Sequence, residues 1–334
     1  MDLTWPIGAL KFSAVIAFCG QLAWANACVV STRAKWDSVI HTTVSADGQM
    51  VAALWNAGTK EQVLCFRLLA NDARWQSVKA PPLTRTIQFA VQGHDLLLTS
   101  AEPAMNRDVL ARLNIDKPGA EAVRIHVGGN LAFPVEISPG RIMVRTRVAA
   151  EPKAANPSYL LGYRWIVVGP DGRIEKVGPD PIFPYSAPNI VGSGFFWVDA
   201  RPGPLQPEQH PIFHSFALPG GVAPTMPRAR FSKDTFNVRC DRSATRCLRN
   251  FISNLGQKPQ GKFVYDIEVF FGPASCRLQG VSGRHSAISI TPDGNTAVFA
   301  MEAINDKAPH VVAIKFNSQR CDPLSIQHFY LEEK

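Results

Sequence analysis

The sequence predicts an all-β fold, a β-propeller of four-stranded antiparallel blades, on three observations. Two distant segments, 40–55 and 286–301, share one pattern: an apolar-alternating strand, an Asp-Gly turn and a second alternating strand. Asp-Gly between alternating runs is a strong hairpin signal, because glycine supplies the positive φ that the tight turn needs. Turns of this kind recur about every 50 residues, which is a propeller period. Long helical periodicity is absent, and 26 prolines and 24 glycines punctuate the chain.

Six such units can be placed in order along the chain. One four-stranded sheet cannot bury both of its faces, so the units are expected to stack around an axis and share a core. We therefore predict six blades, with seven as the alternative, and an N-terminal arm, residues 28–36, that is available to close the ring by pairing with the last blade. The predicted strands are 39–45, 50–55, 62–69 and 75–79 in the first unit; 86–91, 96–100, 108–115 and 122–127 in the second; 133–138, 142–148, 159–168 and 173–177 in the third; 189–191, 195–199 and 212–218 in the fourth; 229–231, 236–240, 248–253 and 264–271 in the fifth; and the hairpin 286–301, 310–316 and 325–330 in the sixth.

Residues 1–27 have the features of a cleaved secretory signal peptide. Lys11 precedes the apolar run 12–20, and Ala25-Asn26-Ala27 is a small-x-small cleavage site. The run is shorter than the about 20 apolar residues that a membrane-spanning helix needs. We expect an exported protein, periplasmic or secreted, with no transmembrane segment and a mature part, residues 28–334, that forms a single domain. A lipid anchor on Cys28, directly after the cleavage site, is the alternative for the mature N-terminus.

Loss of the signal peptide leaves an even number of cysteines, which fits disulfides in an oxidising compartment. Cys240 and Cys247 flank a polar loop and are expected to close a hairpin. Cys28 and Cys321 lie near the two ends of the chain, where a bridge could latch a closed ring. The sequence does not fix the connectivity, because six cysteines allow about 15 pairings. The six are Cys28, Cys65, Cys240, Cys247, Cys276 and Cys321.

Positive charge is concentrated in residues 228–249 of a chain whose formal net charge is +8. Only Asp234 and Asp241 oppose the basic residues there, so the stretch is either a solvated face or a site that attracts an anionic partner. We predict the second, with this stretch as the partner-binding surface. Nucleic acid is not expected, because no nucleic-acid-binding module is recognisable. The predicted binding residues are Arg228, Arg230, Lys233, Arg239, Arg242, Arg246 and Arg249.

Two turn motifs resemble the repeat of a known propeller family. Ser45-Ala46-Asp47-Gly48 and Thr291-Pro292-Asp293-Gly294, each followed by an apolar strand, are similar to the Ser-Pro-Asp-Gly repeat of TolB-like (WD40-like, PD40) β-propellers. Ser138-Pro139-Gly140 lacks the Asp of that repeat, and Ser232-Lys233-Asp234-Thr235 lacks the Gly. The resemblance implies an architecture shared by binding proteins and by domains of enzymes, so it predicts fold rather than function.

No complete catalytic or metal-binding set is recognisable, and we predict no catalytic residue, cofactor or metal. Residues 280–283, Gly-Val-Ser-Gly, are one residue short of a serine-hydrolase nucleophile elbow. His210 and His214 have the spacing of a helical metal pair, but Pro211 and the strand pattern place them off a common helix face. A metal or substrate centre on the ring axis would need two of the histidines near strand ends, which are His41, His94, His126 and His285.

These observations predict an exported, non-catalytic β-propeller, a monomer, that acts as a protein–protein interaction scaffold. Its partner is expected to be another periplasmic or cell-surface protein of acidic character, bound through basic loops. Two alternatives remain open. One is a propeller enzyme, a lyase or hydrolase, acting on an anionic glycan in the axial funnel. The other is a periplasmic inhibitor or immunity-type protein.

Overall fold

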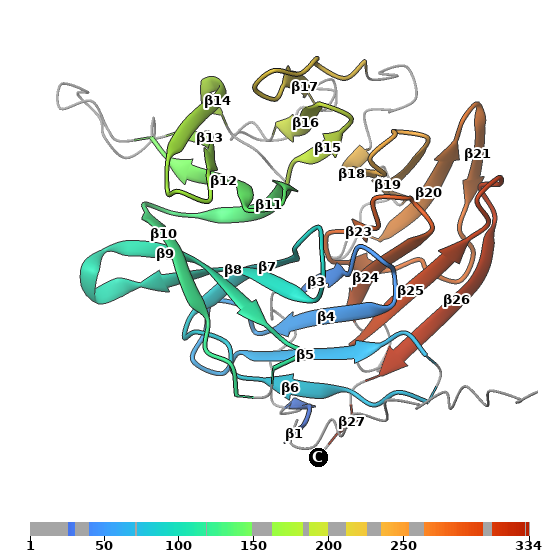
Figure 1. Ribbon diagram of the computed structural model, residues 1–334. Helices are drawn as coiled ribbons and strands as arrows, with labels where there is room; N and C mark the ends of the chain where they lie inside the picture. Colours follow the sequence, from blue (N-terminus) through green and yellow to red (C-terminus); the bar gives the residue numbers. More distant parts are fainter. Residues whose placement is uncertain are drawn as a thin grey trace, which may run out of the picture.

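The protein is an all-β propeller, which confirms the fold predicted from the sequence. The computed structural model describes residues 26–30, 40–70, 72–117, 119–148, 162–182, 187–199, 212–225, 235–253, 264–302, 309–330 and 332–333. Six antiparallel sheets, the blades, stand around one axis (Figure 1), and a single 3-10 turn, η1 (Pro103–Met105), is the only helical element in these ranges. None of the described helical structure is long and apolar enough to cross a membrane.

Each blade is laid down from its innermost strand outward, so the first strands of all six blades meet in the centre of Figure 1. Blades 1 to 3 contain β3 (His41–Val44), β4 (Met50–Trp55), β5 (Val63–Leu68) and β6 (Gln76–Val78); β7 (Thr84–Phe89), β8 (Asp95–Glu102), β9 (Arg107–Asn114) and β10 (Val123–Gly128); and β11 (Ala132–Ser138), β12 (Arg141–Arg147), β13 (Tyr163–Val168) and β14 (Ile174–Ile182). Blades 4 to 6 contain β15 (Asn189–Val191), β16 (Gly194–Asp199) and β17 (Ile212–Ala217); β18 (Thr235–Cys240), β19 (Arg246–Ile252), β20 (Tyr265–Phe271) and β21 (Ala274–Arg277); and β22 (Arg284–His285), β23 (Ser289–Ile290), β24 (Thr296–Glu302), β25 (His310–Phe316) and β26 (Pro323–Tyr330).

The Ser/Thr-x-Asp-Gly turn fixes both its own shape and the contact between blades. Ser45 Oγ donates to Asp47 and accepts the Met50 N–H at 2.9 Å, so the side chains close the turn from inside. Gly48 has φ +68°, and a Cβ there would lie 2.7 Å from Thr296 Oγ1 of blade 6. The glycine is therefore needed for its backbone conformation and for the close approach of the neighbouring blade.

The fifth blade begins later in the chain than the sequence predicted. Residues 229–231, predicted as its first strand, lie outside the described residues, and the predicted second strand, 236–240, is the innermost strand β18. The turn that follows β18 is residues 241–245, where Ala244 takes φ +56°, the left-handed conformation that the repeat normally gives to glycine. Because this turn has alanine where the repeat has glycine, the sequence did not reveal it. The prediction therefore placed the first turn of blade 5 at Ser232-Lys233-Asp234 and missed the outer strand β21.

The core consists of hydrophobic clusters that each join two neighbouring blades. Along β4, Val51, Ala53 and Trp55 pack against blade 6, whereas the alternate residues Met50, Ala52 and Leu54 pack against blade 2. The remaining interfaces follow the same rule, and four tryptophans, Trp55, Trp75, Trp165 and Trp197, are buried in these clusters. One alternating strand thus supplies apolar side chains to two interfaces.

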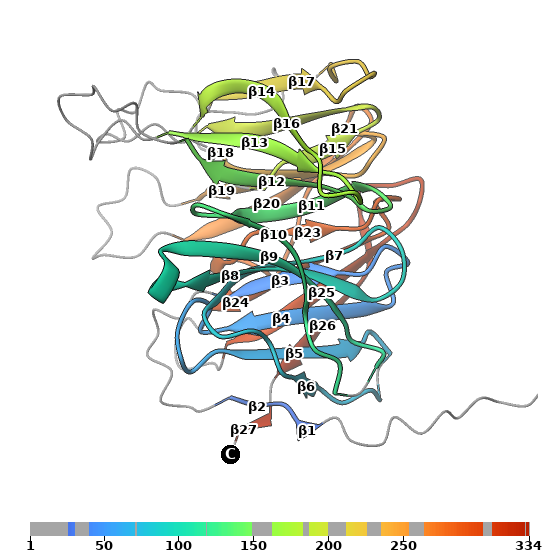
Figure 2. The same ribbon diagram turned by 60° about the vertical axis from the view of Figure 1, so that its left-hand side comes forward.

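The described strands close the ring without a blade shared between the two termini, which corrects the expected closure. Among the described residues, blade 1 holds only N-terminal strands and blade 6 only C-terminal strands. Instead, β1 (Asn26–Ala27), at the end of the predicted signal peptide, lies on the outer edge of blade 1 beside β6. In the arm, β2 (Val29–Val30) pairs in parallel with the C-terminal β27 (Glu332–Glu333). Figures 1 and 2 both place β1 and β27 together outside blade 1. Residues 1–25 of the predicted signal peptide lie outside the described residues.

Three disulfides reinforce the ring at separate places. Cys240 pairs with Cys247 across the β18–β19 hairpin, as the sequence suggested. Cys28 pairs with Cys65 rather than with Cys321, so the proposed latch between the two ends is wrong. Cys321 pairs with Cys276 and ties the outer strand of blade 5 to blade 6. A sulfur held in a disulfide cannot carry a thioether-linked lipid, so the Cys28–Cys65 bond argues against an anchor at Cys28.

The disulfides are expected to contribute unequally to stability, because they close chain segments of different length. The separations are 37 residues for Cys28–Cys65, 45 for Cys276–Cys321 and 7 for Cys240–Cys247. Loop-closure entropy gives about 4 kcal/mol for each long segment and about 2.5 kcal/mol for the short one. Denaturant unfolding of the three paired Cys→Ala variants measures this order. A larger loss for Cys240→Ala/Cys247→Ala than for the other two pairs would contradict it.

Candidate functional site

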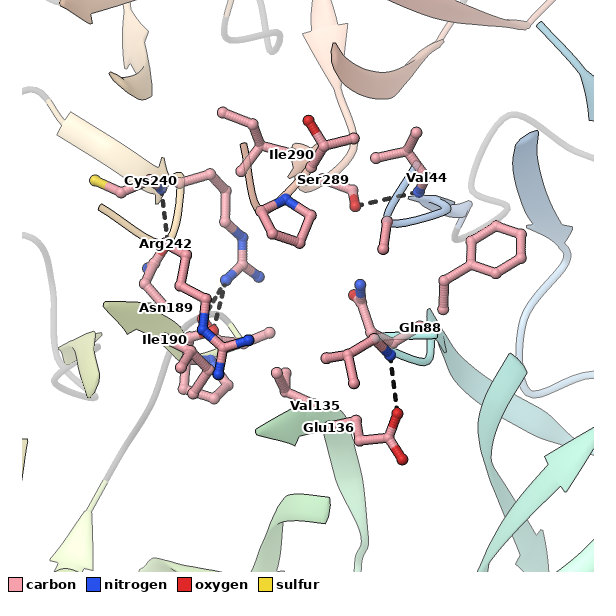
Figure 3. Close-up of a pocket in the computed structure, with 18 of the residues that line it drawn as sticks. Val44, Gln88, Val135, Glu136, Asn189, Ile190, Cys240, Arg242, Ser289 and Ile290 are labelled. Carbon is pink, nitrogen blue, oxygen red and sulfur yellow. Dashed lines mark hydrogen bonds between the residues drawn. The ribbon is translucent and has the colours of Figure 1, made fainter. Parts of the chain in front are cut away.

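A cavity of about 120 Å³ lies on the axis of the ring. Residues from all six blades line it, and in Figure 3 the labelled side chains surround one open space. Ala46, Arg242 and Pro292 belong to the turns that join first to second strands, so the cavity lies toward this face of the ring, which we call the turn face. The cavity is the candidate site because it is the place where every blade contributes to one surface.

Arg239 on β18 brings a positive charge to the wall of this cavity. Its Nε donates to the Ile288 carbonyl at 3.1 Å, and its Nη1 donates to the carbonyls of Ala187 at 2.6 Å and Pro188 at 3.1 Å. These three bonds tie blade 5 to blades 4 and 6. Burial lowers the pKa of Arg239 to about 10, which leaves the side chain charged at neutral pH.

Arg242 lies at the turn face and links blade 5 to blades 3, 4 and 6. Its backbone N–H donates to the Pro292 carbonyl at 2.9 Å, and its carbonyl accepts the Gly192 N–H at 2.8 Å. Its Nη2 donates to the Ile137 carbonyl of blade 3 at 2.6 Å. In Figure 3 the Arg242 side chain extends from blade 5 toward Val135. Arg242 therefore places a second guanidinium over the space that Arg239 lines.

The acidic residue of the cavity, Glu136, is already engaged. One oxygen accepts the Val91 N–H at 2.8 Å, the other accepts the Gly140 N–H at 2.8 Å and a bond from Arg112. No carboxylate of the described residues forms an ion pair with Arg239 or Arg242, whose side chains donate to neutral carbonyls. The cavity thus holds two cations and lacks a matching anion within the part of the chain that the structure describes.

The predicted basic surface divides into residues with different roles. Arg228, Arg230 and Lys233 lie outside the described residues. Arg246 is only 1% exposed and donates to the carbonyls of Gly294, Asn317 and Arg320, so it ties blade 5 to blade 6. Arg249 pairs with Glu268 at 2.6 Å within blade 5. Neither of these two side chains is open to a partner, which leaves Arg239 and Arg242 as the described members that face the axis.

The described histidines do not form the axial centre that an enzyme would need, because none of them lines the cavity. His285 donates to the Val281 carbonyl and packs on Phe299, and His94 lies between Asp116 and Asp47 at 2.9 and 3.6 Å. The one cluster of possible metal ligands in the described ranges is Cys276, Cys321 and Asp322, whose two sulfurs form a disulfide. His214 stacks on Trp197, and His210 lies outside the described residues.

Several residues of the site carried no signal in the sequence. The carbonyls of Ala187, Pro188 and Ile288 hold Arg239, and any residue type supplies a carbonyl. Asn189 accepts the Cys240 N–H at 2.9 Å and donates to the Val238 carbonyl at 3.0 Å, which fixes β15 against β18. Its position at the start of a first strand is the only clue that the sequence offers.

Arg246 and Arg242 are expected to respond differently to substitution. Arg246→Ala leaves buried carbonyls without their donor and should lower the free energy of unfolding by about 3 kcal/mol. Arg242 is exposed and donates one side-chain bond, so Arg242→Ala should cost less than about 1 kcal/mol. Denaturant unfolding of the two variants tests this, and equal losses would contradict the division.

Acid is expected to weaken the fold through two partly buried histidines. Burial lowers the pKa of His41 and of His285 to about 4. The unfolded chain, with a histidine pKa of about 6.5, takes up the proton first. Stability is therefore complete above about pH 6.5 and is lost as the pH falls toward 4, by up to about 3 kcal/mol for each histidine.

The variant His285→Asn separates the loss of stability caused by histidine protonation from the loss caused by carboxylate protonation. The free energy of unfolding of this variant, measured by denaturant titration from pH 8 to pH 4, should fall less steeply than that of the wild type below pH 6.5. The two curves should run parallel between pH 7 and 8. Identical slopes over the acid range would mean that His285 does not titrate as its burial predicts.

Comparison with known proteins places the fold. No protein-family model and no curated protein matches the sequence. TolB from Acinetobacter baumannii superposes with a TM-score of 0.55 at 10% identity, over 82% of this chain and 63% of that one. The chain thus spans about 63% of the length of that TolB.

Two further structures are similar at lower scores. They are a putative TolB from Agrobacterium tumefaciens (TM-score 0.47, 16% identity, 77% of this chain and 86% of that one) and the β-propeller domain of the Trilobed protease from Pyrococcus furiosus (0.48, 8%, 87% and 97%). At such identities a likeness shows the fold alone. Together with the six blades and the Asp-Gly turns, the superposition on TolB identifies the fold of this protein as a TolB-like β-propeller.

Proposed function

We propose that the protein is an exported, non-catalytic scaffold that binds an acidic partner protein at the turn face, around the axial cavity. The observation that carries this proposal is the pair of guanidinium groups, Arg239 and Arg242, which have only neutral partners. Charges of one sign in a concave, partly buried site attract and orient an oppositely charged partner. The acidic partner is thus expected at the axis rather than along the whole basic stretch of the sequence.

The proposed location outside the cytoplasm rests on two features. Three disulfides hold the blades, and such bonds persist in oxidising compartments. The apolar run before residue 28 has the features of a secretory signal. Cleavage after Ala27 would remove β1 and leave Cys28 at the mature N-terminus, with its bond to Cys65 as the attachment of the arm.

The enzyme alternative lacks support at the axis. A lyase or hydrolase acting on an anionic glycan needs a general acid or base beside the substrate. No histidine of the described ranges lines the cavity, and its carboxylate, Glu136, is held by two backbone N–H groups and Arg112. Its volume of about 120 Å³ is also well below the roughly 300–1,000 Å³ of pockets that enclose small-molecule ligands.

The proposal predicts that partner capture depends on charge at the turn face. Wild-type protein and Arg242→Glu serve as baits in native periplasmic extract, and mass spectrometry identifies what each retains. The wild type should retain an acidic protein that Arg242→Glu loses, and retention should weaken between 50 and 500 mM salt, on the order of a Debye-length change from about 14 to 4 Å.

Arg74→Glu is the matched control, because Arg74 is an exposed arginine beside the outer strand of blade 1. It makes the same change in net charge far from the axis and should retain the partner. A basic partner, or an acidic one retained equally by Arg242→Glu, would overturn the proposal.

A further inference from the structure

We propose that the axial cavity is a binding site for a single carboxylate carried on a short aliphatic stem, either a glutamate or aspartate side chain or the C-terminus of the partner. This inference rests on the proposed function and names the group that the partner inserts. It depends on four properties of the cavity: its net charge, the donors that remain free, its apolar walls and its size.

The charge of the cavity is not balanced by the described residues. Arg239 is enclosed by the carbonyls of Ala187, Pro188 and Ile288, which are dipoles and not anions. Burial, with no carboxylate beside it, accounts for the lowered pKa of Arg239. Arg239 is partly buried, and a cation that is withdrawn from water is ordinarily paired, because that withdrawal is costly. A ligand anion would supply the missing partner.

The free donors suit a carboxylate. Arg239 uses Nε and Nη1, which leaves Nη2 without a hydrogen bond among the described residues. Arg242 uses Nη2, which leaves Nε and Nη1. Both side chains come from blade 5 and line the same cavity, and N–H groups of guanidinium bond strongly to the planar pair of oxygens in a carboxylate.

Four backbone N–H groups at the cavity are not free to cradle a phosphate. The N–H groups of Val44, Val91, Cys240 and Arg242 all donate to neighbouring blades. Phosphate sites typically gather several free backbone N–H groups around the oxygens. Because these amides are occupied, the cavity provides a few side-chain donors, enough for a monoanion with two oxygens.

The walls indicate that the anion comes on an aliphatic stem. Val44, Val91, Val135, Ile190 and Ile290 line the cavity between the polar groups. Apolar walls of this kind stabilise methylene groups by removing them from water. A volume of about 120 Å³ is smaller than the roughly 150 Å³ cavity that holds one benzene, so one side chain fits and a sugar ring with its neighbours does not.

The test uses small probes and the full protein. N-acetylglutamate N-methylamide presents a side-chain carboxylate, N-acetylalanine presents a terminal carboxylate, and N-acetylglutamine N-methylamide is the neutral match of the first. Binding is followed by amide chemical shifts in ¹H–¹⁵N NMR spectra at low salt. One or both acids should shift signals of the cavity, such as Gln88, Val91 and Ile190, and bind at least tenfold more tightly than the neutral probe and than inorganic phosphate.

Variants decide whether the guanidinium groups are responsible. Arg242→Gln should weaken the acidic probe at least tenfold, whereas Arg74→Gln should leave its affinity unchanged. Because Arg242→Gln keeps a side-chain donor and Arg242 is exposed, loss of folding is not expected and is checked in the same spectra. The better of the two acidic probes identifies the source of the carboxylate.

The outcomes separate this inference from the proposed function. Equal binding of the acidic and neutral probes, tighter binding of phosphate, or shifts outside the cavity would overturn the carboxylate site, even if Arg242→Glu still loses the captured protein. Conversely, tight binding of the acid with no captured partner would support the site and remove the scaffold proposal.

Discussion

Each blade of this ring depends on its two neighbours to bury its faces, and the innermost strands enforce that dependence with hydrogen bonds between blades. The Phe89 N–H donates to Thr43 Oγ1 at 3.0 Å, the Val44 N–H donates to Ser289 Oγ at 3.3 Å, and Asn189 joins β15 to β18 in the same way. First strands have no strand on their axial edge, so these bonds satisfy backbone groups that would otherwise be orphaned in a narrow space. They also make the dimensions of the cavity a property of the whole ring.

The part of the fold that could be predicted is the part that is encoded locally. Alternation of apolar residues along β4 and the glycines at 48 and 294 are visible in the sequence, because a period of two and a positive φ are properties of a few adjacent residues. The prediction misplaced the start of blade 5 because Ala244 takes the left-handed conformation at a position where glycine would have indicated the turn. The pairing of Cys28 with Cys65 depends on where the arm lies in space, which spacing alone does not determine.

The sequence predicted that the candidate site is positively charged, but it did not predict where in the fold the site lies. The sequence identified the arginines of residues 228–249 as one group, yet their roles follow from strand number. Arg246, at the start of the second strand β19, lies between blades 5 and 6, whereas Arg239, on the first strand, faces the axis. The direction of a side chain in a propeller depends on which strand of its blade carries it. That assignment was wrong for blade 5, because the turn at Ala244 lacks the glycine that would have identified it.

The contacts between blades explain why residue 239 has a hydrogen-bond donor, but they do not explain why that donor is charged. Three carbonyls from blades 4 and 6 need a branched donor, and a guanidinium reaches all of them. Burial nevertheless works against its charge, as the lowered pKa shows, and a neutral set of contacts would avoid that cost. Arg242 adds a second cation to the same space, and one side-chain hydrogen bond, to the Ile137 carbonyl, holds it there. The fold needs hydrogen-bond donors at these positions, but it does not need two positive charges. An anion that enters from the turn face explains the two guanidinium groups better than the requirements of the fold do.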